Sequence, residues 1–144
     1  MSTSYAVLTD LEALWGKREV EVCSDWDNSG SLNTANVTNC LVAATEAMNR
    51  YIAVRYSIPL TVIPNDLIRV CCDIGMYLLC PFASMITEHK QKRYDQAIAF
   101  LKDLSTGKAT LGEEQNSEVS ATVAEVSYAG RERELTRESM KRLL

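Results

Sequence analysis

The chain has 144 residues, of which 47% are hydrophobic and 24% charged, and its formal net charge is −4. These values are typical of one globular domain, and they exclude a fully disordered chain, a collagen and a coiled-coil rod. The acidic balance argues against a protein that grips nucleic acid over its whole surface. No apolar stretch reaches the roughly 20 residues of a membrane span, and residues 1–9 lack a signal-peptide pattern. We therefore expect a protein made in the cytosol with no membrane segment.

Two short helices and a loop are expected first. Thr9-Asp10-Leu11-Glu12 has the spacing of a capping box, which predicts a helix from there to Trp15. Residues 19–24 alternate like a strand, but the segment is short and we favour a second helix over a strand. Residues 25–36 are rich in Asp, Asn, Ser and Gly, which predicts a loop.

Three longer helices follow. Apolar residues recur every three or four positions from a start near Thr34 or Asn36 to residue 57, which predicts an amphipathic helix. Two prolines predict extended backbone over residues 58–64. The next helix, residues 65–80, is apolar nearly all round, so we expect it to be central and buried. A last helix is predicted over residues 92–104, with a glycine just beyond its end.

The composition changes after Gly112. Residues 113–130 are acidic and small, which is typical of a flexible or extended arm, and residues 131–144 are basic and could form a short helix. The sequence thus predicts an all-α core over residues 1–112, an arm and a basic terminal segment. We favour docking of this segment on a partner over a solvated terminal helix. The residues expected to dock are Arg131, Arg133, Leu135, Arg137, Lys141, Arg142, Leu143 and Leu144.

The loop over residues 25–36 contains a pattern that is partly that of a calcium loop. Asp25, Asp27 and Ser29 place oxygens at alternating positions before a glycine. Asn36 stands where a bidentate Glu should be, which would make cation binding weak. We favour a polar loop that caps the following helix over a weak cation site.

Asp73 lies inside the most apolar helix. A lone buried carboxylate is costly unless it is paired. Arg69 lies four residues earlier, and Arg55 ends the neighbouring predicted helix. We therefore predict a structural ion pair between Asp73 and one of these arginines, in preference to an acid catalyst.

Cysteine and histidine chemistry is the other candidate for catalysis. The five cysteines are odd in number and lack zinc-site spacing, which predicts reduced and mostly buried thiols. The only histidine, His89, lies in a polar run and is expected to be exposed. No phosphate-binding glycine loop or nucleophile elbow is found, so we predict no enzyme and no cofactor. The cysteines are Cys23, Cys40, Cys71, Cys72 and Cys80.

The order of several motifs resembles a known family. The chain begins Tyr5-Ala6-Val7-Leu8-Thr9-Asp10-Leu11 and continues with Arg55-Tyr56-x-x-Pro59-Leu60 and Pro64-x-x-Leu67. Cys72-Asp73-Ile74, Arg93-Tyr94-Asp95-x-Ala97-Ile98 and Gly107-x-x-x-Leu111-Gly112 follow, and the ending is Leu135-Thr136-Arg137-Glu138-Ser139-Met140-Lys141. This order and spacing resembles the Mu-like phage head–tail connector proteins, also called neck or adaptor proteins.

The resemblance implies a structural virion protein with no catalytic residues. Such a protein is made in the host cytoplasm and forms a homo-oligomeric ring, expected to be twelvefold, at the head–tail junction. Its partners would be the portal protein and a tail-terminator or second neck protein. DNA would pass through the ring without sequence-specific binding.

Two hypotheses that assign the chain to other classes of protein stay open. One is a soluble helical adaptor or regulator that binds a protein partner through its C-terminal segment. The other, which we favour least, is a cysteine-dependent enzyme.

Overall fold

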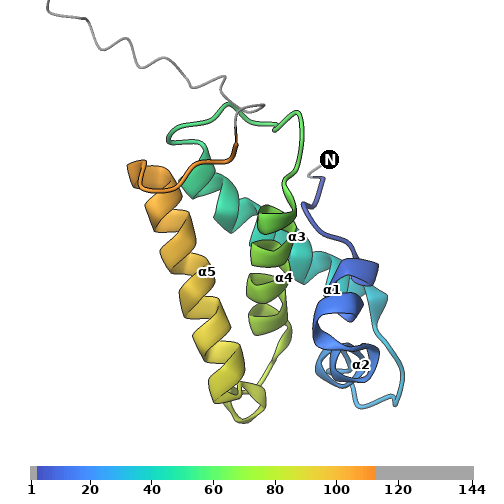
Figure 1. Ribbon diagram of the computed structural model, residues 1–144. Coiled ribbons are helices and arrows are strands. Elements are labelled where there is room, and N and C mark those ends of the chain that lie inside the picture. The colour runs from blue at the N-terminus through green and yellow to red at the C-terminus, as the bar shows by residue number, and fades with distance from the viewer. Residues whose placement is uncertain (1–2, 113–144) are drawn as a thin grey trace, which may run out of the picture.

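The computed structural model describes residues 3–112, and over this range it contains helices and no strand (Figure 1). The predicted all-α fold is confirmed. Predictions for residues 113–144, the extended arm and the terminal helix, lie outside the described residues. The elements in chain order are α1 (Leu8–Trp15), α2 (Lys17–Ser24), α3 (Thr34–Ile52), α4 (Asn65–Leu79), the short 3₁₀ helix η1 (Ala83–Met85) and α5 (Glu88–Thr106).

Helix α4 is the centre of the bundle. It contacts α3 and α5 as well as α1 and α2, and Figure 1 shows α5 on one side of it and the α1–α2 pair on the other. This position explains its nearly uniform apolar composition, since almost every face of the helix meets a neighbour. Its buried residues are Leu67, Val70, Cys71, Cys72, Asp73, Ile74, Gly75, Met76 and Leu79.

Helices α1, α2 and α5 begin earlier than predicted, α2 at Lys17 instead of residue 19. Helix α1 begins at Leu8 with Val7 as its N-cap, and the Asp10 carboxylate accepts a hydrogen bond from the Val7 amide at 3.0 Å. The capping box predicted at Thr9 is therefore wrong. Helix α5 begins at Glu88, because the Thr87 hydroxyl oxygen caps it by accepting the Lys90 amide at 3.3 Å.

Helix α3 ends at Ile52, five residues before the predicted end at 57. The Tyr56 amide still donates to the Ile52 carbonyl at 2.9 Å, so the chain makes one more turn before leaving the helix axis. Tyr56 is only 2% exposed and packs against the segment that follows α5. A tertiary contact thus overrides the helical periodicity of these residues. No helix within residues 3–112 has the length and apolar character to cross a membrane.

Candidate functional site

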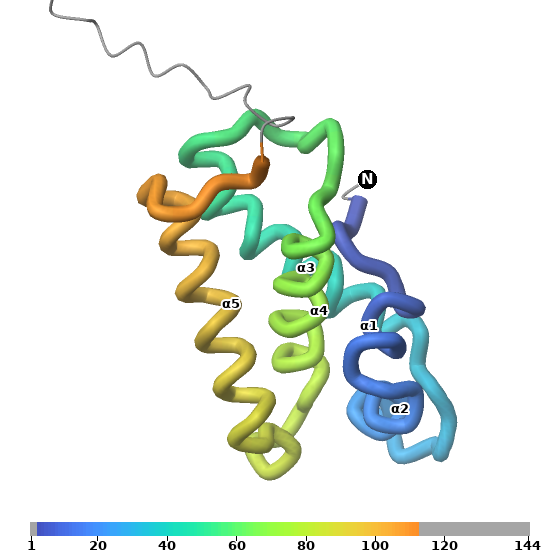
Figure 2. The backbone as a smooth tube through the Cα atoms, viewed as in Figure 1, coloured from blue at the N-terminus to red at the C-terminus, as the bar shows by residue number. Residues whose placement is uncertain are grey.

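The described chain ends beside the loop that joins α3 to α4 (Figure 2). Gly107 ends α5 in the left-handed conformation, with φ 88°. The chain then folds back, and the Leu111 amide donates to the Tyr56 hydroxyl at 3.2 Å. We call residues 53–64 and 107–112 the exit face, because the rest of the chain continues from it.

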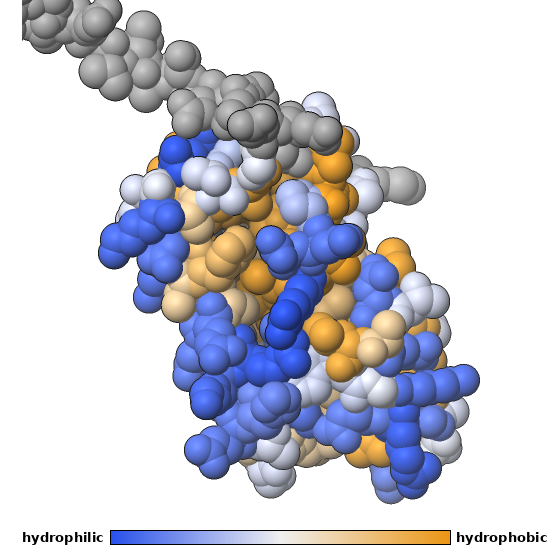
Figure 3. Space-filling model, in the orientation of Figure 1, coloured by the Kyte–Doolittle hydropathy of each residue, from blue (hydrophilic) through white to orange (hydrophobic). Residues whose placement is uncertain are grey.

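The exit face exposes large apolar side chains. Val54, Ile58 and Val62 are 63%, 40% and 49% exposed. The Arg55 guanidinium fixes the edge of this face by donating to the Ala109 carbonyl at 3.5 Å. Figure 3 shows apolar surface at this end of the molecule. Large apolar side chains that are exposed at one end of a molecule are candidates for a contact surface.

The eight residues predicted to dock on a partner, all within residues 131–144, lie outside the described residues. The structure therefore does not test their role. It does place the point from which residues 113–144 continue, which is Gly112 on the exit face.

The ion pair predicted for Asp73 exists, but its partner was predicted wrongly. Asp73 Oδ1 lies 3.0 Å from Nη2 of Arg93 on α5. Burial raises the pKa of Asp73, although Arg93 and, more weakly, Arg69 favour its charged form. Arg69 is exposed, and Arg55 lies at the exit face. Sequence spacing suggested Arg69, and its place at the end of the neighbouring predicted helix suggested Arg55, whereas the packing of α5 on α4 selects Arg93.

A basic pocket opens beside this ion pair. It has a volume of about 260 Å³ and is lined by Arg69, His89, Lys92, Arg93 and Gln96. The Arg93 guanidinium also lies 5.0 Å from the Trp15 ring centre. The pocket presents hydrogen-bond donors and positive charge, which suits a carboxylate or a phosphate. His89 is exposed, as predicted, and packs edge-on against Trp15.

The Asp25 carboxylate holds the loop over residues 25–36 together by accepting backbone hydrogen bonds. Asp25 Oδ1 accepts the Ser29 amide and Oδ2 accepts the Gly30 amide, both at 2.7 Å. These bonds lower the pKa of Asp25. The Asn36 side chain donates to the Ser24 carbonyl at 2.9 Å, so it ties the loop to α2. These contacts favour the polar loop over the cation site.

Asp27, the other carboxylate of that pattern, is exposed. No group of three or more His, Cys, Asp or Glu that could hold a metal ion occurs within residues 3–112.

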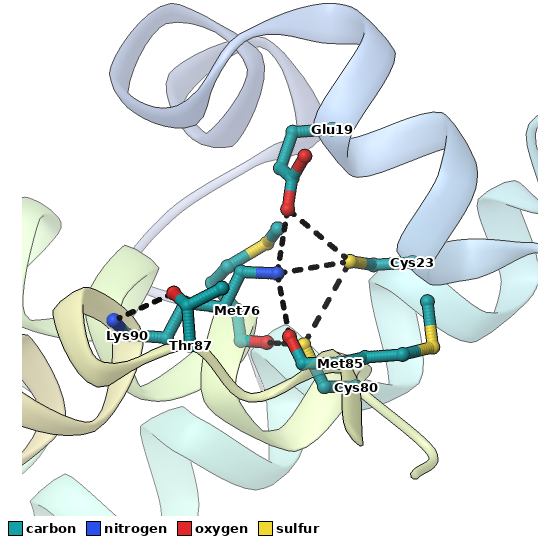
Figure 4. Close-up of polar contacts among 7 residues, drawn as sticks. All are labelled: Glu19, Cys23, Met76, Cys80, Met85, Thr87 and Lys90. Carbon is teal, nitrogen blue, oxygen red and sulfur yellow. Dashed lines mark hydrogen bonds and ion pairs between the residues drawn. The ribbon is translucent and has the colours of Figure 1, made fainter. Parts of the chain in front are cut away.

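A polar cluster that the sequence did not predict lies where α2 meets the end of α4. Lys90 is only 4% exposed, and its Nζ contacts Glu19 Oε1 at 2.6 Å, the Met85 carbonyl at 3.0 Å and Cys23 Sγ at 3.4 Å (Figure 4). Cys80 Sγ lies 3.7 Å from Cys23 Sγ. We call Glu19, Cys23, Cys80 and Lys90 the Lys90 cluster. All five cysteines are reduced and buried, as predicted.

The sequence holds a signal for the Lys90 cluster. Ala97, Leu101 and Leu104 form the buried face of α5. Extending that face back by seven residues, or two helical turns, reaches Lys90. The sequence analysis missed that Lys90 is buried, because a lysine is almost never fully buried unless it is paired.

Comparison with known proteins identifies the family. Residues 5–129 match the family described as bacteriophage Mu, Gp36. The chain is 27% identical over 118 residues to gene product J of Escherichia phage Mu, which covers 81% of this chain and 82% of that protein.

A second relative is the Mu-like prophage FluMu protein gp36 of Haemophilus influenzae. It is 33% identical over 82 residues, and the chain spans 57% of its length. Because the family match covers most of the sequence, the chain belongs to the bacteriophage Mu Gp36 family of Mu-like phage proteins.

Proposed function

We propose that this phage protein is a structural component of the virion, a head–tail connector that forms a ring between the portal and the tail. The exit face carries the proposal. It exposes Val54, Ile58 and Val62 beside the point where the chain continues into its C-terminal segment. An apolar surface next to a departing segment gives a subunit two adjacent means of holding a neighbour in a ring.

The charge distribution supports different roles for the three parts of the chain. Residues 1–112 carry a net charge of −2, residues 113–130 carry −4 and residues 131–144 carry +2. A net acidic core suits the wall of a channel, because it repels the DNA backbone and lets the duplex slide. The basic end suits an acidic surface on another protein.

We propose that residues 131–144 dock on the portal or on a neighbouring subunit. The basic side chains would meet acidic groups, so this part of the binding weakens as salt rises. Leu135, Leu143 and Leu144 would supply the part that salt does not change. A segment that is ordered on binding can cover a long surface, at the cost of its conformational entropy.

The direct test mixes the purified protein with its portal and examines the products by negative-stain microscopy and pull-down. We expect rings or portal-bound complexes from the full chain. A chain truncated after Gly130 is expected to keep its helical circular dichroism signal and to lose stable attachment. Full portal binding by the truncated chain would refute the docking role.

The exit face has its own matched test. Val62→Ser removes an apolar side chain that is 49% exposed on this face, and Val22→Ser removes one that is 51% exposed on α2. We expect Val62→Ser to weaken ring formation at least severalfold and Val22→Ser to leave it unchanged. Monomers that never bind a portal but capture another protein through residues 131–144 would favour the adaptor instead.

A further inference from the structure

The Lys90 cluster brings together two thiols that are far apart in the sequence. Cys23 lies on α2 and Cys80 follows α4, and their sulfur atoms are 3.7 Å apart (Figure 4). A disulfide bond is about 2.05 Å long, so the sulfurs need to approach by less than 2 Å. Side-chain rotation can supply a movement of this size in part, and α2 can supply the rest because it is a short helix near the surface.

The surroundings of the two sulfurs favour thiolate chemistry. The hydrogen bond with Cys23 and the ammonium of Lys90 lower the pKa of Cys80 to about 7, against the effect of burial. The hydrogen bond with Cys80 and burial raise the pKa of Cys23. Lys90, anchored by Glu19, therefore stabilises negative charge on the pair, and ionisation of Cys80 is favoured over that of Cys23.

We propose that Cys23 and Cys80 are a redox-responsive pair that forms an intramolecular disulfide when the protein meets a peroxide. Cys80 is 8% exposed and Cys23 is 1% exposed, so the oxidant reaches Cys80 first. The cytosol would keep the pair reduced, whereas an oxidising medium outside the cell would let it close. The proposal concerns the core alone and does not depend on the connector role.

The reaction balances with hydrogen peroxide as the two-electron oxidant. The Cys80 thiolate attacks one peroxide oxygen, the O–O bond breaks, and the departing hydroxide takes up a proton to become water. This leaves a sulfenic acid on Cys80. The Cys23 sulfur then attacks the Cys80 sulfur, the S–S bond forms as the S–O bond breaks, and the thiol proton leaves with the oxygen as a second water.

The disulfide would tie α2 to the corner between α4 and α5. The two cysteines are 57 residues apart in the chain, so the link closes a long loop that includes α3 and α4. Cross-links that close long loops restrict the unfolded chain most. We therefore expect the oxidised protein to melt about 10 °C higher than the reduced protein, and dithiothreitol to reverse the shift.

Peptide mapping of the full chain after graded peroxide treatment tests the proposal. Trypsin leaves Cys23 with Cys40 in residues 19–50, and Cys80 with Cys71 and Cys72 in residues 70–90. We expect these two peptides to be linked, with the loss of two hydrogen atoms, in the unreduced sample.

Three variants assign the link. Cys23→Ser and Cys80→Ser are expected to abolish it. Cys40→Ser is the matched control, because Cys40 is as exposed as Cys80 at 8%, and this variant should keep the link. A link that survives in Cys23→Ser, or a wild type whose Cys80 oxidises without linking, would overturn the proposal.

The role of Lys90 is tested by rate. Lys90→Met removes the ammonium that stabilises the thiolate, so a smaller fraction of the pair is ionised at neutral pH. We expect oxidation at least about tenfold slower than in the wild type. An unchanged rate would show that Lys90 does not activate the pair.

Discussion

Two ion pairs attach α5 to the rest of the bundle, and they differ in how far protein contacts replace the water that their charged groups lose. Asp73 meets Arg93 at 3.0 Å, and Lys90 meets Glu19 at 2.6 Å. Burial raises the pKa of Asp73, which for an acid means that the fold disfavours its charge. Burial lowers the pKa of Lys90, but the contacts with Glu19, Cys23 and Cys80 outweigh burial, so its pKa is raised. For a base, a raised pKa means that the fold favours the charged form.

The number of partners explains the difference. The Lys90 ammonium has three hydrogens to donate and three partners within 3.4 Å, and Glu19 is 46% exposed and keeps part of its hydration. The side chains of Arg93 and Asp73 are 17% and 9% exposed, so both ions have lost most of their water. Within residues 3–112, Asp73 Oδ1 and Arg93 Nη2 find no hydrogen-bond partner of good geometry despite their short distance. A buried ion pair stabilises a fold only when such contacts replace the lost water.

Removing Arg93 should have the largest effect. Arg93→Met leaves the Asp73 carboxylate buried without its partner, which is expected to lower the free energy of unfolding by about 3 kcal/mol at neutral pH. Urea unfolding followed by circular dichroism measures this change. Arg69→Met is the matched control, because Arg69 is exposed and makes no ion pair with Asp73, and its effect should stay below about 1 kcal/mol.

A second variant separates the cost of the stranded charge from lost packing. Asp73→Asn combined with Arg93→Met leaves no ion at this position, so the double variant should be more stable than Arg93→Met alone. A double variant that is the least stable of the set would show that the pair contributes net stability, contrary to the comparison above.

Replacing Lys90 should cost less. Lys90→Met removes its three contacts but leaves Glu19 free to face water, and the methionine fills the space with apolar atoms. We expect a loss of about 1–2 kcal/mol in the free energy of unfolding. Lys92→Met, on the exposed side of α5, provides the control and should change stability little. A loss larger than that of Arg93→Met would reverse the order of the two ion pairs.

The sequence predicts the helices better than it predicts their contacts. The apolar character of residues 65–80 identifies the central helix, because nearly every one of its faces is covered. The predicted helix ends are wrong where a single contact sets them. Thr87 caps the start of α5, and α3 ends before Tyr56, whose hydroxyl accepts a hydrogen bond from the Leu111 amide. Periodicity records which residues are buried on average and carries no information about such single contacts.

The candidate sites show the same limit. The apolar residues around Asp73 in the sequence predict that its carboxylate is buried, and a buried carboxylate needs a partner. The identity of the partner depends on how α5 packs against α4, and Arg93 is distant in sequence from Asp73. The helical spacing of α5 places Lys90 on its buried face, but its partners lie on segments that meet Lys90 only in the folded chain, so no local pattern identifies them.

The smallest expected effect is a pH dependence that tests the sign of the Asp73 shift. A carboxyl group whose pKa is raised on folding contributes stability that is complete below its unfolded pKa of 3.8 and is lost as pH rises through the folded pKa. Wild type should therefore lose stability relative to Asp73→Asn as pH rises from 3.8 toward neutrality, since the asparagine has no charge to bury. Urea unfolding of both proteins at several pH values gives this difference, and circular dichroism at each pH confirms that both start folded. The comparison cancels the titration of groups that the two proteins share, including Asp25, whose lowered pKa acts in the opposite direction. A difference that grows in favour of wild type with rising pH would mean that Arg93 outweighs burial, and that the two ion pairs stabilise the bundle in the same way.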